Sequence, residues 1–132
     1  MGAKTAAERF RTAVEALHLE GMMEALHPQV VFKSPVVYGR YEGVEAVAVL
    51  LRAVSETFED FRYVGEMGGE DVHGLLFEAR VGDRELEGID IIRAAPDGRI
   101  AELTVMVRPM SGVIALAQAM APKVEGLAKA GS

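Results

Sequence analysis

A change of hydrophobic period near residue 60 constrains the fold more than any other feature of the sequence. Between residues 43 and 58, apolar or small side chains recur at the spacing of three and four that marks one face of a helix. These side chains are Val44, Val47, Ala48, Leu51, Val54, Ser55 and Phe58. From about residue 61 to residue 107 the pattern alternates instead, which is typical of strands with one buried face. A helix followed by a run of strands predicts an α+β fold, with helices on one face of an antiparallel sheet.

Shorter signals mark the remaining elements. Thr5 followed by Glu8 forms a capping box, so a first helix is expected to begin near Thr5. A short second helix is expected over Gly21 to Leu26, followed by a strand in VVFKSP that stops at Pro35. Four more strands are expected at about 61–67, 73–81, 84–94 and 99–107, and a closing helix from about residue 111.

Length and charge exclude several classes of protein. A chain of 132 residues suits one domain spanning residues 1–132, and its 50% hydrophobic content excludes a disordered chain. The net charge of -6, without a basic cluster, argues against a nucleic-acid partner. The absence of cysteine excludes disulfides, thiolate metal sites and cysteine nucleophiles. Because the amino terminus is polar and no apolar run is long enough for a membrane span, we expect a cytoplasmic protein with no membrane partner.

One carboxylate interrupts the apolar pattern of the expected strand 84–94. Alternation puts Gly88, Asp90 and Ile92 on one face of this strand. Matching faces across the hairpins places Asp90 on the side of the sheet that the helices cover, and places Ile100 on the other side. The residues expected on the same side as Asp90 are Leu75, Phe77, Ala101, Leu103, Val105 and Val107. A charge removed from water costs several kcal/mol unless it is paired or protonated, so Asp90 has either a structural partner or a function.

Two interpretations of Asp90 remain open. In the first, Asp90 is structural and bonded to a hydroxyl or an amide, or a bulge reverses the parity of the strand. In the second, Asp90 belongs to a binding site, because the missing side chain of Gly88 on the same face leaves room for a ligand.

Three local patterns resemble the nuclear transport factor 2-like superfamily, which includes ketosteroid isomerases, SnoaL-like polyketide cyclases and limonene-epoxide hydrolases. They are VVFKSP, YGRYEGVEAVAVLL and GIDIIRAAPDGRIAELTVMVRP, and with the order of elements they cover nearly the whole chain. The resemblance implies a cone-shaped roll, in which a curved antiparallel sheet wraps around the N-terminal helices and a C-terminal helix follows. It also implies an apolar pocket inside the cone and, commonly, a dimer joined through the outer side of the sheet.

The resemblance carries only part of the family's chemistry onto this chain. Asp90 falls where the isomerases hold a protonated aspartic acid that donates a hydrogen bond to the substrate oxygen. Ser34 and Phe10 fall where they keep the proton-abstracting aspartate and the oxyanion-binding tyrosine, so the usual steroid isomerisation is not expected. Val105 falls where the epoxide hydrolases need an acid, which disfavours that activity. In a SnoaL-like cyclase, Asp90 could act as an acid or base, with His73 as a second group if it faces inward.

The leading hypothesis is therefore a protein whose apolar pocket binds a small hydrophobic molecule through Asp90. Asp90 and His73 are the catalytic candidates, and the lining candidates are Ser34, Tyr63, Phe77, Gly88, Leu103 and Val105. Tyr38 and Tyr41, on either side of Gly39, could line the mouth of the pocket. The three histidines lack metal-ligand spacing, so neither a metal nor another cofactor is expected. The alternatives are an enzyme that uses Asp90 as a general acid (isomerase, polyketide-cyclase-like or hydrolase-like) and a dimeric interaction module with a vestigial pocket.

The opposite face of the predicted sheet suggests a homodimer. Charged residues alternate there with apolar ones, a mixture that suits a self-complementary two-fold contact. The residues concerned are Glu78, Arg80, Glu87, Arg93 and Glu102, interleaved with Leu76, Ile89, Ile91 and Met106.

Overall fold

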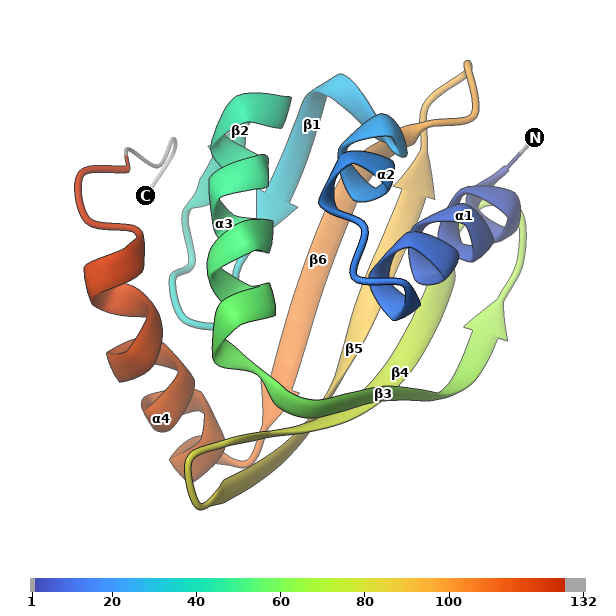
Figure 1. Cartoon of the computed structure of the whole chain (residues 1–132). Helices are drawn as coiled ribbons and strands as arrows, with labels where there is room; N and C mark the ends of the chain where they lie inside the picture. Colours follow the sequence, from blue (N-terminus) through green and yellow to red (C-terminus); the bar gives the residue numbers. More distant parts are fainter. Residues whose placement is uncertain (1, 128–132) are drawn as a thin grey trace.

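The computed structural model describes residues 2–127, which form an α+β fold with helices packed on one face of a six-stranded sheet (Figure 1). The elements are α1 (Ala3–Glu15), α2 (Leu19–Glu24), β1 (Leu26–Lys33), β2 (Arg40–Glu42), α3 (Val44–Thr57), β3 (Glu59–Gly68), β4 (His73–Val81), β5 (Arg84–Ala94), β6 (Ile100–Arg108), α4 (Met110–Met120) and the short 3₁₀ helix η1 (Ala121–Lys123). This agrees with the predicted fold class.

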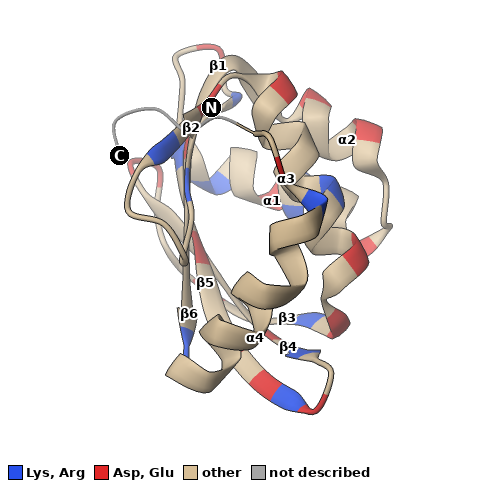
Figure 2. Cartoon of the chain, turned by 90° about the vertical axis from the view of Figure 1, so that its left-hand side faces the viewer, with Lys and Arg blue, Asp and Glu red and all other residues tan. Residues whose placement is uncertain are grey.

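The sheet is strongly curved, and its strand order is β2-β1-β6-β5-β4-β3. Figure 1 shows α1, α2 and α3 on the concave side, with α4 alongside α3. Neighbouring strands run antiparallel except β1 and β6, which are parallel. No charged residue occurs in α4 (Figure 2), and its Leu116 is buried against the other elements. Within residues 2–127, no helix is both long enough and apolar enough to cross a membrane.

Helix bounds near the amino terminus differ from the predictions. α1 begins at Ala3 and has no side-chain cap, so the predicted capping box at Thr5 is wrong. The N–H group of Ala3 instead donates to the carbonyl oxygen of Glu70 at 2.7 Å, a tertiary contact that fixes the start of the helix two residues earlier. α2 begins and ends two residues before the predicted range, and Leu26 already belongs to β1.

The predicted inner face of the sheet is largely confirmed. In the ladder, Asp90 pairs with Leu75 on one side and with Val105 on the other, as expected from alternation. The predicted face of Ile100, at the start of β6, is wrong. Arg93 pairs with Glu102, whereas the next residue, Ala94, pairs with Ile100. This irregularity makes Ala101 the extra residue and turns Ile100, which is fully buried, toward the helices.

Candidate functional site

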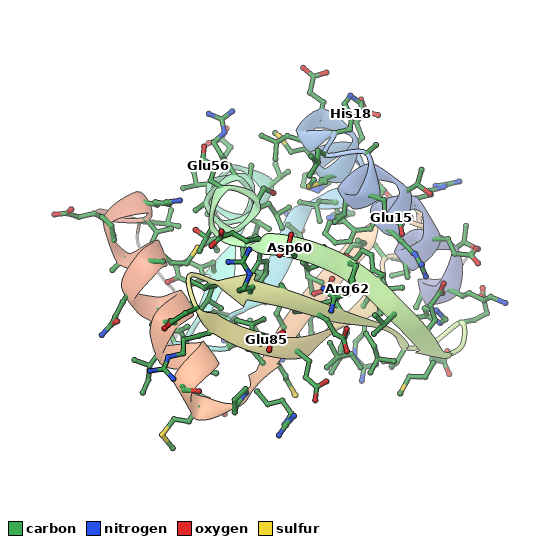
Figure 3. All side chains as sticks on the ribbon, turned by 60° about the horizontal axis from the view of Figure 1, so that its bottom comes forward. Glu15, His18, Glu56, Asp60, Arg62 and Glu85 are labelled. Atoms are coloured by element: carbon green, nitrogen blue, oxygen red, sulfur yellow. The ribbon has the colours of Figure 1, made fainter. Side chains whose placement is uncertain are left out.

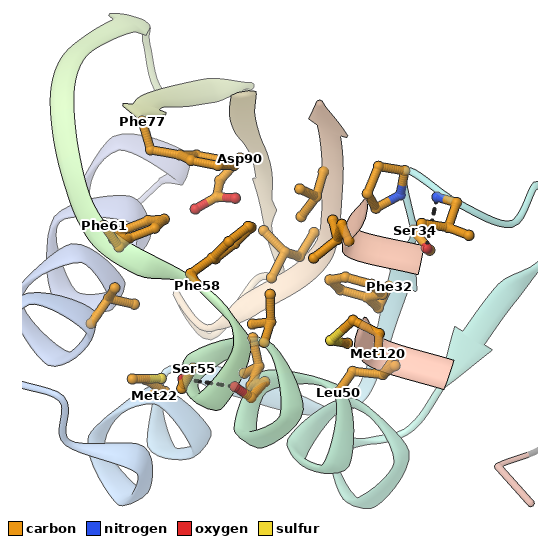
Figure 4. A pocket seen from close by; sticks show the side chains of 18 of the residues that line it. Met22, Phe32, Ser34, Leu50, Ser55, Phe58, Phe61, Phe77, Asp90 and Met120 are labelled. Carbon is orange, nitrogen blue, oxygen red and sulfur yellow. Dashed lines mark hydrogen bonds between the residues drawn. The ribbon is translucent and has the colours of Figure 1, made fainter. Parts of the chain in front are cut away.

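A cavity of about 790 Å³ lies between the concave face of the sheet and the helices. Its volume is in the range of sites that hold small organic molecules. Most of the lining is apolar, with Phe10, Met22, Phe32, Leu50, Phe58 and Phe77 among its walls (Figure 4). These side chains come from α1, α2, β1, α3 and β4 and from the α3–β3 junction, so the fold as a whole creates the space.

Asp90 is the only carboxylate on the buried part of this lining within residues 2–127. It is 7% exposed, and its Oδ2 atom accepts a hydrogen bond from the Tyr63 hydroxyl at 2.8 Å. Burial raises the pKa of the Asp90 carboxyl from 3.8 to about 7, and the bond from Tyr63 acts in the opposite direction. The Oδ1 atom makes no hydrogen bond with any residue that the structure describes. At neutral pH Asp90 therefore offers a carboxyl group that is protonated about half the time and has one oxygen free.

Tyr63 is placed to hold Asp90 in this orientation. It is buried on β3, and the Arg11 guanidinium lies 5.5 Å above the centre of its ring. Burial, together with the charge of Asp90, raises the pKa of Tyr63 well above 10, so its hydroxyl stays protonated and acts as a donor. Both interpretations drawn from the sequence thus apply to Asp90, because it has a hydroxyl partner and also borders a cavity.

Aromatic rings make the surroundings of Asp90 apolar. The ring of Phe61 lies 5.0 Å from that of Tyr63 in an edge-to-face arrangement and 5.0 Å from that of Phe77. Phe58 stacks on Phe61 at 5.5 Å. In Figure 4, Phe58, Phe61 and Phe77 surround the Asp90 carboxyl on the side of the cavity nearest β3 and β4. This arrangement explains the loss of solvation that raises the pKa of Asp90.

Most of the predicted lining residues meet at this cavity. Ser34, Tyr63, Phe77, Leu103 and Val105 all line it together with Asp90. The expectation that Gly88 leaves room for a ligand is wrong, because a Cβ atom at Gly88 would come within 2.5 Å of the Phe77 Cζ atom. The ring of Phe77 already occupies that space, and Gly88 does not line the cavity.

His73 faces inward but does not line the cavity. Its Nε2 atom lies 2.8 Å from Glu66 Oε1, and Glu66 also pairs with Arg11 at 2.9 Å. Bonds to His73 and Arg11 lower the pKa of Glu66, although its partial burial opposes them. The structure therefore does not bring His73 and Asp90 together at one cavity, as a shared catalytic role would require.

Some residues of the cavity were not anticipated from the sequence. Glu15 on α1 and Asp60 and Arg62 on β3 stand at its rim (Figure 3), and no periodic pattern singles them out. Arg11 pairs with Glu15, and Arg80 pairs with Asp60, so both rim carboxylates are already engaged. Of the two tyrosines expected at the mouth, Tyr41 lines the cavity, whereas Tyr38 is fully exposed.

Comparison with known proteins identifies similar chains. The family described as the SnoaL-like domain matches residues 7–103. A crystal structure of a steroid delta-isomerase from Pseudomonas aeruginosa is 39% identical, with 92% of this chain and 90% of that chain covered and a TM-score of 0.86. An uncharacterized protein with a cystatin-like fold from Silicibacter pomeroyi is 30% identical, with 92% and 86% covered and a TM-score of 0.86.

A third structure shares the fold alone. It is a nuclear transport factor 2-like protein of unknown function from Cytophaga hutchinsonii, 16% identical, with 82% of this chain and 91% of that chain covered and a TM-score of 0.63. No curated protein matches the sequence.

Proposed function

We propose that the cavity of this chain binds a small apolar molecule through Asp90. The premise is that the chain belongs to the SnoaL-like domain family and has the nuclear transport factor 2-like fold. One observation carries this proposal. A carboxyl group with a pKa of about 7 borders a cavity of about 790 Å³, and one of its two oxygens has no partner within residues 2–127. A protonated carboxyl in an apolar cavity donates a hydrogen bond well, because water does not compete there.

The expected ligand carries an oxygen acceptor on an apolar body. Tyr63 holds Oδ2, so the acidic proton on Oδ1 can be donated to a carbonyl or hydroxyl oxygen of the ligand. The aromatic and aliphatic walls then bury the remainder of the ligand, which supplies most of the affinity.

A matched pair of probes tests this proposal. Acetylnaphthalene and ethylnaphthalene have similar shapes, and only the first has an oxygen for Asp90. We expect acetylnaphthalene to bind more tightly at pH 6, and to lose about tenfold in affinity by pH 8, since only the protonated fraction of Asp90 donates. Asp90→Asn should still bind this ketone through its amide N–H group, without the pH dependence. Equal affinity for the two probes, or the same pH profile in Asp90→Asn, would refute the proposal.

The second candidate is an enzyme that isomerises or cyclises a carbonyl compound with Asp90 as general acid. The 39% identity to the steroid delta-isomerase favours it. Against it, Glu15 and Asp60, the other lining carboxylates within residues 2–127, lie at the rim in ion pairs, so no second carboxylate stands beside Asp90 to abstract a proton. An assay for such an activity measures the ultraviolet absorbance of the conjugated isomer that forms from a β,γ-unsaturated ketone. An enzyme should lose it in Asp90→Asn, whereas a binding protein shows none.

A further inference from the structure

We infer that Arg11 is a positioning residue of the candidate site, whose guanidinium fixes the ring of Tyr63 so that the Tyr63 hydroxyl stays bonded to Asp90. Arg11 does not line the cavity, so it influences a ligand only through the side chains between them. This inference rests on the proposed function, since it concerns the carboxyl group that binds the ligand oxygen. It adds a residue of α1 outside the cavity to those that determine ligand affinity.

Two carboxylates hold the Arg11 guanidinium in one orientation. Its Nε atom donates to the Oε2 atom of Glu15 at 3.2 Å, on α1, and its Nη1 atom donates to the Oε2 atom of Glu66 at 2.9 Å, on β3. A guanidinium is planar and rigid, so two bonds from different nitrogen atoms fix the direction of its plane. The group therefore has a defined place between α1 and β3.

Glu66 is itself fixed by His73. The Nε2 atom of His73 lies 2.8 Å from the Oε1 atom of Glu66, so each oxygen of this carboxylate has its own partner. Bonds to His73 and Arg11 lower the pKa of Glu66, which keeps the carboxylate ionised and makes Nε2 the donor. The other ring nitrogen of His73, Nδ1, is buried without a hydrogen-bond partner within residues 2–127. The hydrogen bond of the His73 ring thus serves to hold Glu66.

The fixed guanidinium lies above the ring of Tyr63, 5.5 Å from the ring centre, which is within the range of a cation–π interaction. On its edge, the same ring contacts Phe61 at 5.0 Å between ring centres. These two contacts hold the ring in the position from which its hydroxyl reaches Asp90. Burial raises the pKa of Tyr63, and the charge of Arg11 acts in the opposite direction, which makes the hydroxyl a better donor.

Arg11 acts on Asp90 through this bond. The pKa of Asp90 is raised by burial, and the bond from Tyr63 lowers it. Without Arg11, the Tyr63 hydroxyl is held less firmly and donates less well, so the ionised form of Asp90 loses stabilisation and the Asp90 pKa rises. A larger fraction of Asp90 is then protonated above pH 7 and can donate to a ligand. Loss of Arg11 should therefore strengthen binding at high pH, whereas loss of a merely structural contact would not.

Carboxyl NMR titration of the ligand-free protein measures the Asp90 pKa in the wild type, Arg11→Met, Arg11→Lys and Arg40→Met. Arg40 is a matched control, because it pairs with Glu42 at 2.9 Å on β2, at the opposite edge of the sheet from β3. The Arg11 substitutions are repeated together with Tyr63→Phe, as a double-mutant cycle. Arg11→Lys is the milder change and keeps the test available if Arg11→Met does not fold. Calorimetry at pH 6 and pH 8 measures the affinity for acetylnaphthalene.

We expect Arg11→Met to raise the Asp90 pKa by about 0.5 to 1, the effect of one cation–π contact. Arg11→Lys keeps the charge and should raise it less, and Arg40→Met should leave it unchanged. The affinity for acetylnaphthalene in Arg11→Met should improve about two- to fivefold at pH 8 and hardly change at pH 6. In the presence of Tyr63→Phe, Arg11→Met should have no further effect on the Asp90 pKa.

Three results would overturn the inference. An unchanged Asp90 pKa in Arg11→Met would show that Arg11 does not hold the Tyr63 bond. An equal rise in the presence of Tyr63→Phe would show that the Arg11 charge acts on Asp90 directly. A raised pKa without tighter binding of acetylnaphthalene at pH 8 would show that Arg11 does not influence the ligand. If acetylnaphthalene does not bind the wild type at all, the proposed function fails, and the titration, which needs no ligand, still decides whether Arg11 positions Tyr63.

Discussion

Replacing Asp90 by asparagine is expected to make the protein more stable at pH 8 and to change its stability little at low pH. Between pH 4 and pH 7 the folded protein keeps a proton on Asp90 that the unfolded chain has lost, because burial raises the pKa of this carboxyl to about 7. The free energy of unfolding contributed by Asp90 therefore falls as the pH rises through this window and is constant above it.

The size of this effect follows from the pKa shift. The two pH units from 5 to 7 correspond to about 3 kcal/mol of lost stability, on the order of a third of the stability of a small domain. Asparagine does not titrate, and its side-chain oxygen can still accept the hydrogen bond from Tyr63. The difference in unfolding free energy, Asp90→Asn minus wild type, should therefore grow by about 3 kcal/mol between pH 5 and pH 8.

Urea unfolding followed by circular dichroism, at constant ionic strength and at several pH values, measures this difference directly. Asp83→Asn is the matched control, because the Asp83 side chain is 93% exposed and its replacement should give a difference that hardly depends on pH. A constant difference between Asp90→Asn and the wild type from pH 5 to pH 8 would refute the reasoning, since it would mean that Asp90 ionises as it does in water.

Three other substitutions test separate parts of the account. Tyr63→Phe removes the bond that stabilises the ionised form of Asp90, so the Asp90 pKa should rise above its wild-type value in a carboxyl NMR titration; an unchanged pKa would contradict the assigned bond. Val105→Phe should block the cavity and abolish acetylnaphthalene binding, with a cost of about 1–3 kcal/mol in stability; undiminished binding would place the ligand elsewhere. For the homodimer expected through the outer face of the sheet, light scattering should show a dimer. Met106→Glu, on β6, should dissociate this dimer, and the control Val49→Glu, on α3, should not. A monomeric wild type would exclude this interface.

The elements with a long regular period could be predicted from the sequence, and the short or irregular ones could not. α3 and the strands β4 and β5 lie where the spacing of apolar residues places them. β2 has three residues, too few to show any period, and it is defined only by its pairing with β1. The irregular pairing of β6 with β5 lies next to the turn that joins these strands, and alternation alone assigns Ile100 to the wrong face.

The position of Asp90 could be predicted from the sequence, but its partner Tyr63 and the packing around Gly88 could not. Alternation was enough to place Asp90 on the inner face, because β4, β5 and β6 pair without interruption around it. The bond to Tyr63 depends on the register of β3, which shifts between Tyr63 and Gly65 and has no signal in the sequence. Gly88 was misjudged because only the packed structure shows that the ring of Phe77 fills the space beside it.

The central claim is that Asp90 donates a proton in a hydrogen bond to a ligand inside the cavity, and infrared difference spectroscopy of bound acetylnaphthalene tests it most directly. With an isotope-labelled carbonyl group, the stretching frequency of the ketone reports whether its oxygen accepts a strong hydrogen bond. We expect a lowered frequency at pH 6 that returns toward the value in an apolar solvent at pH 9 and in Asp90→Leu. The same frequency in all three samples would contradict the proposed hydrogen bond.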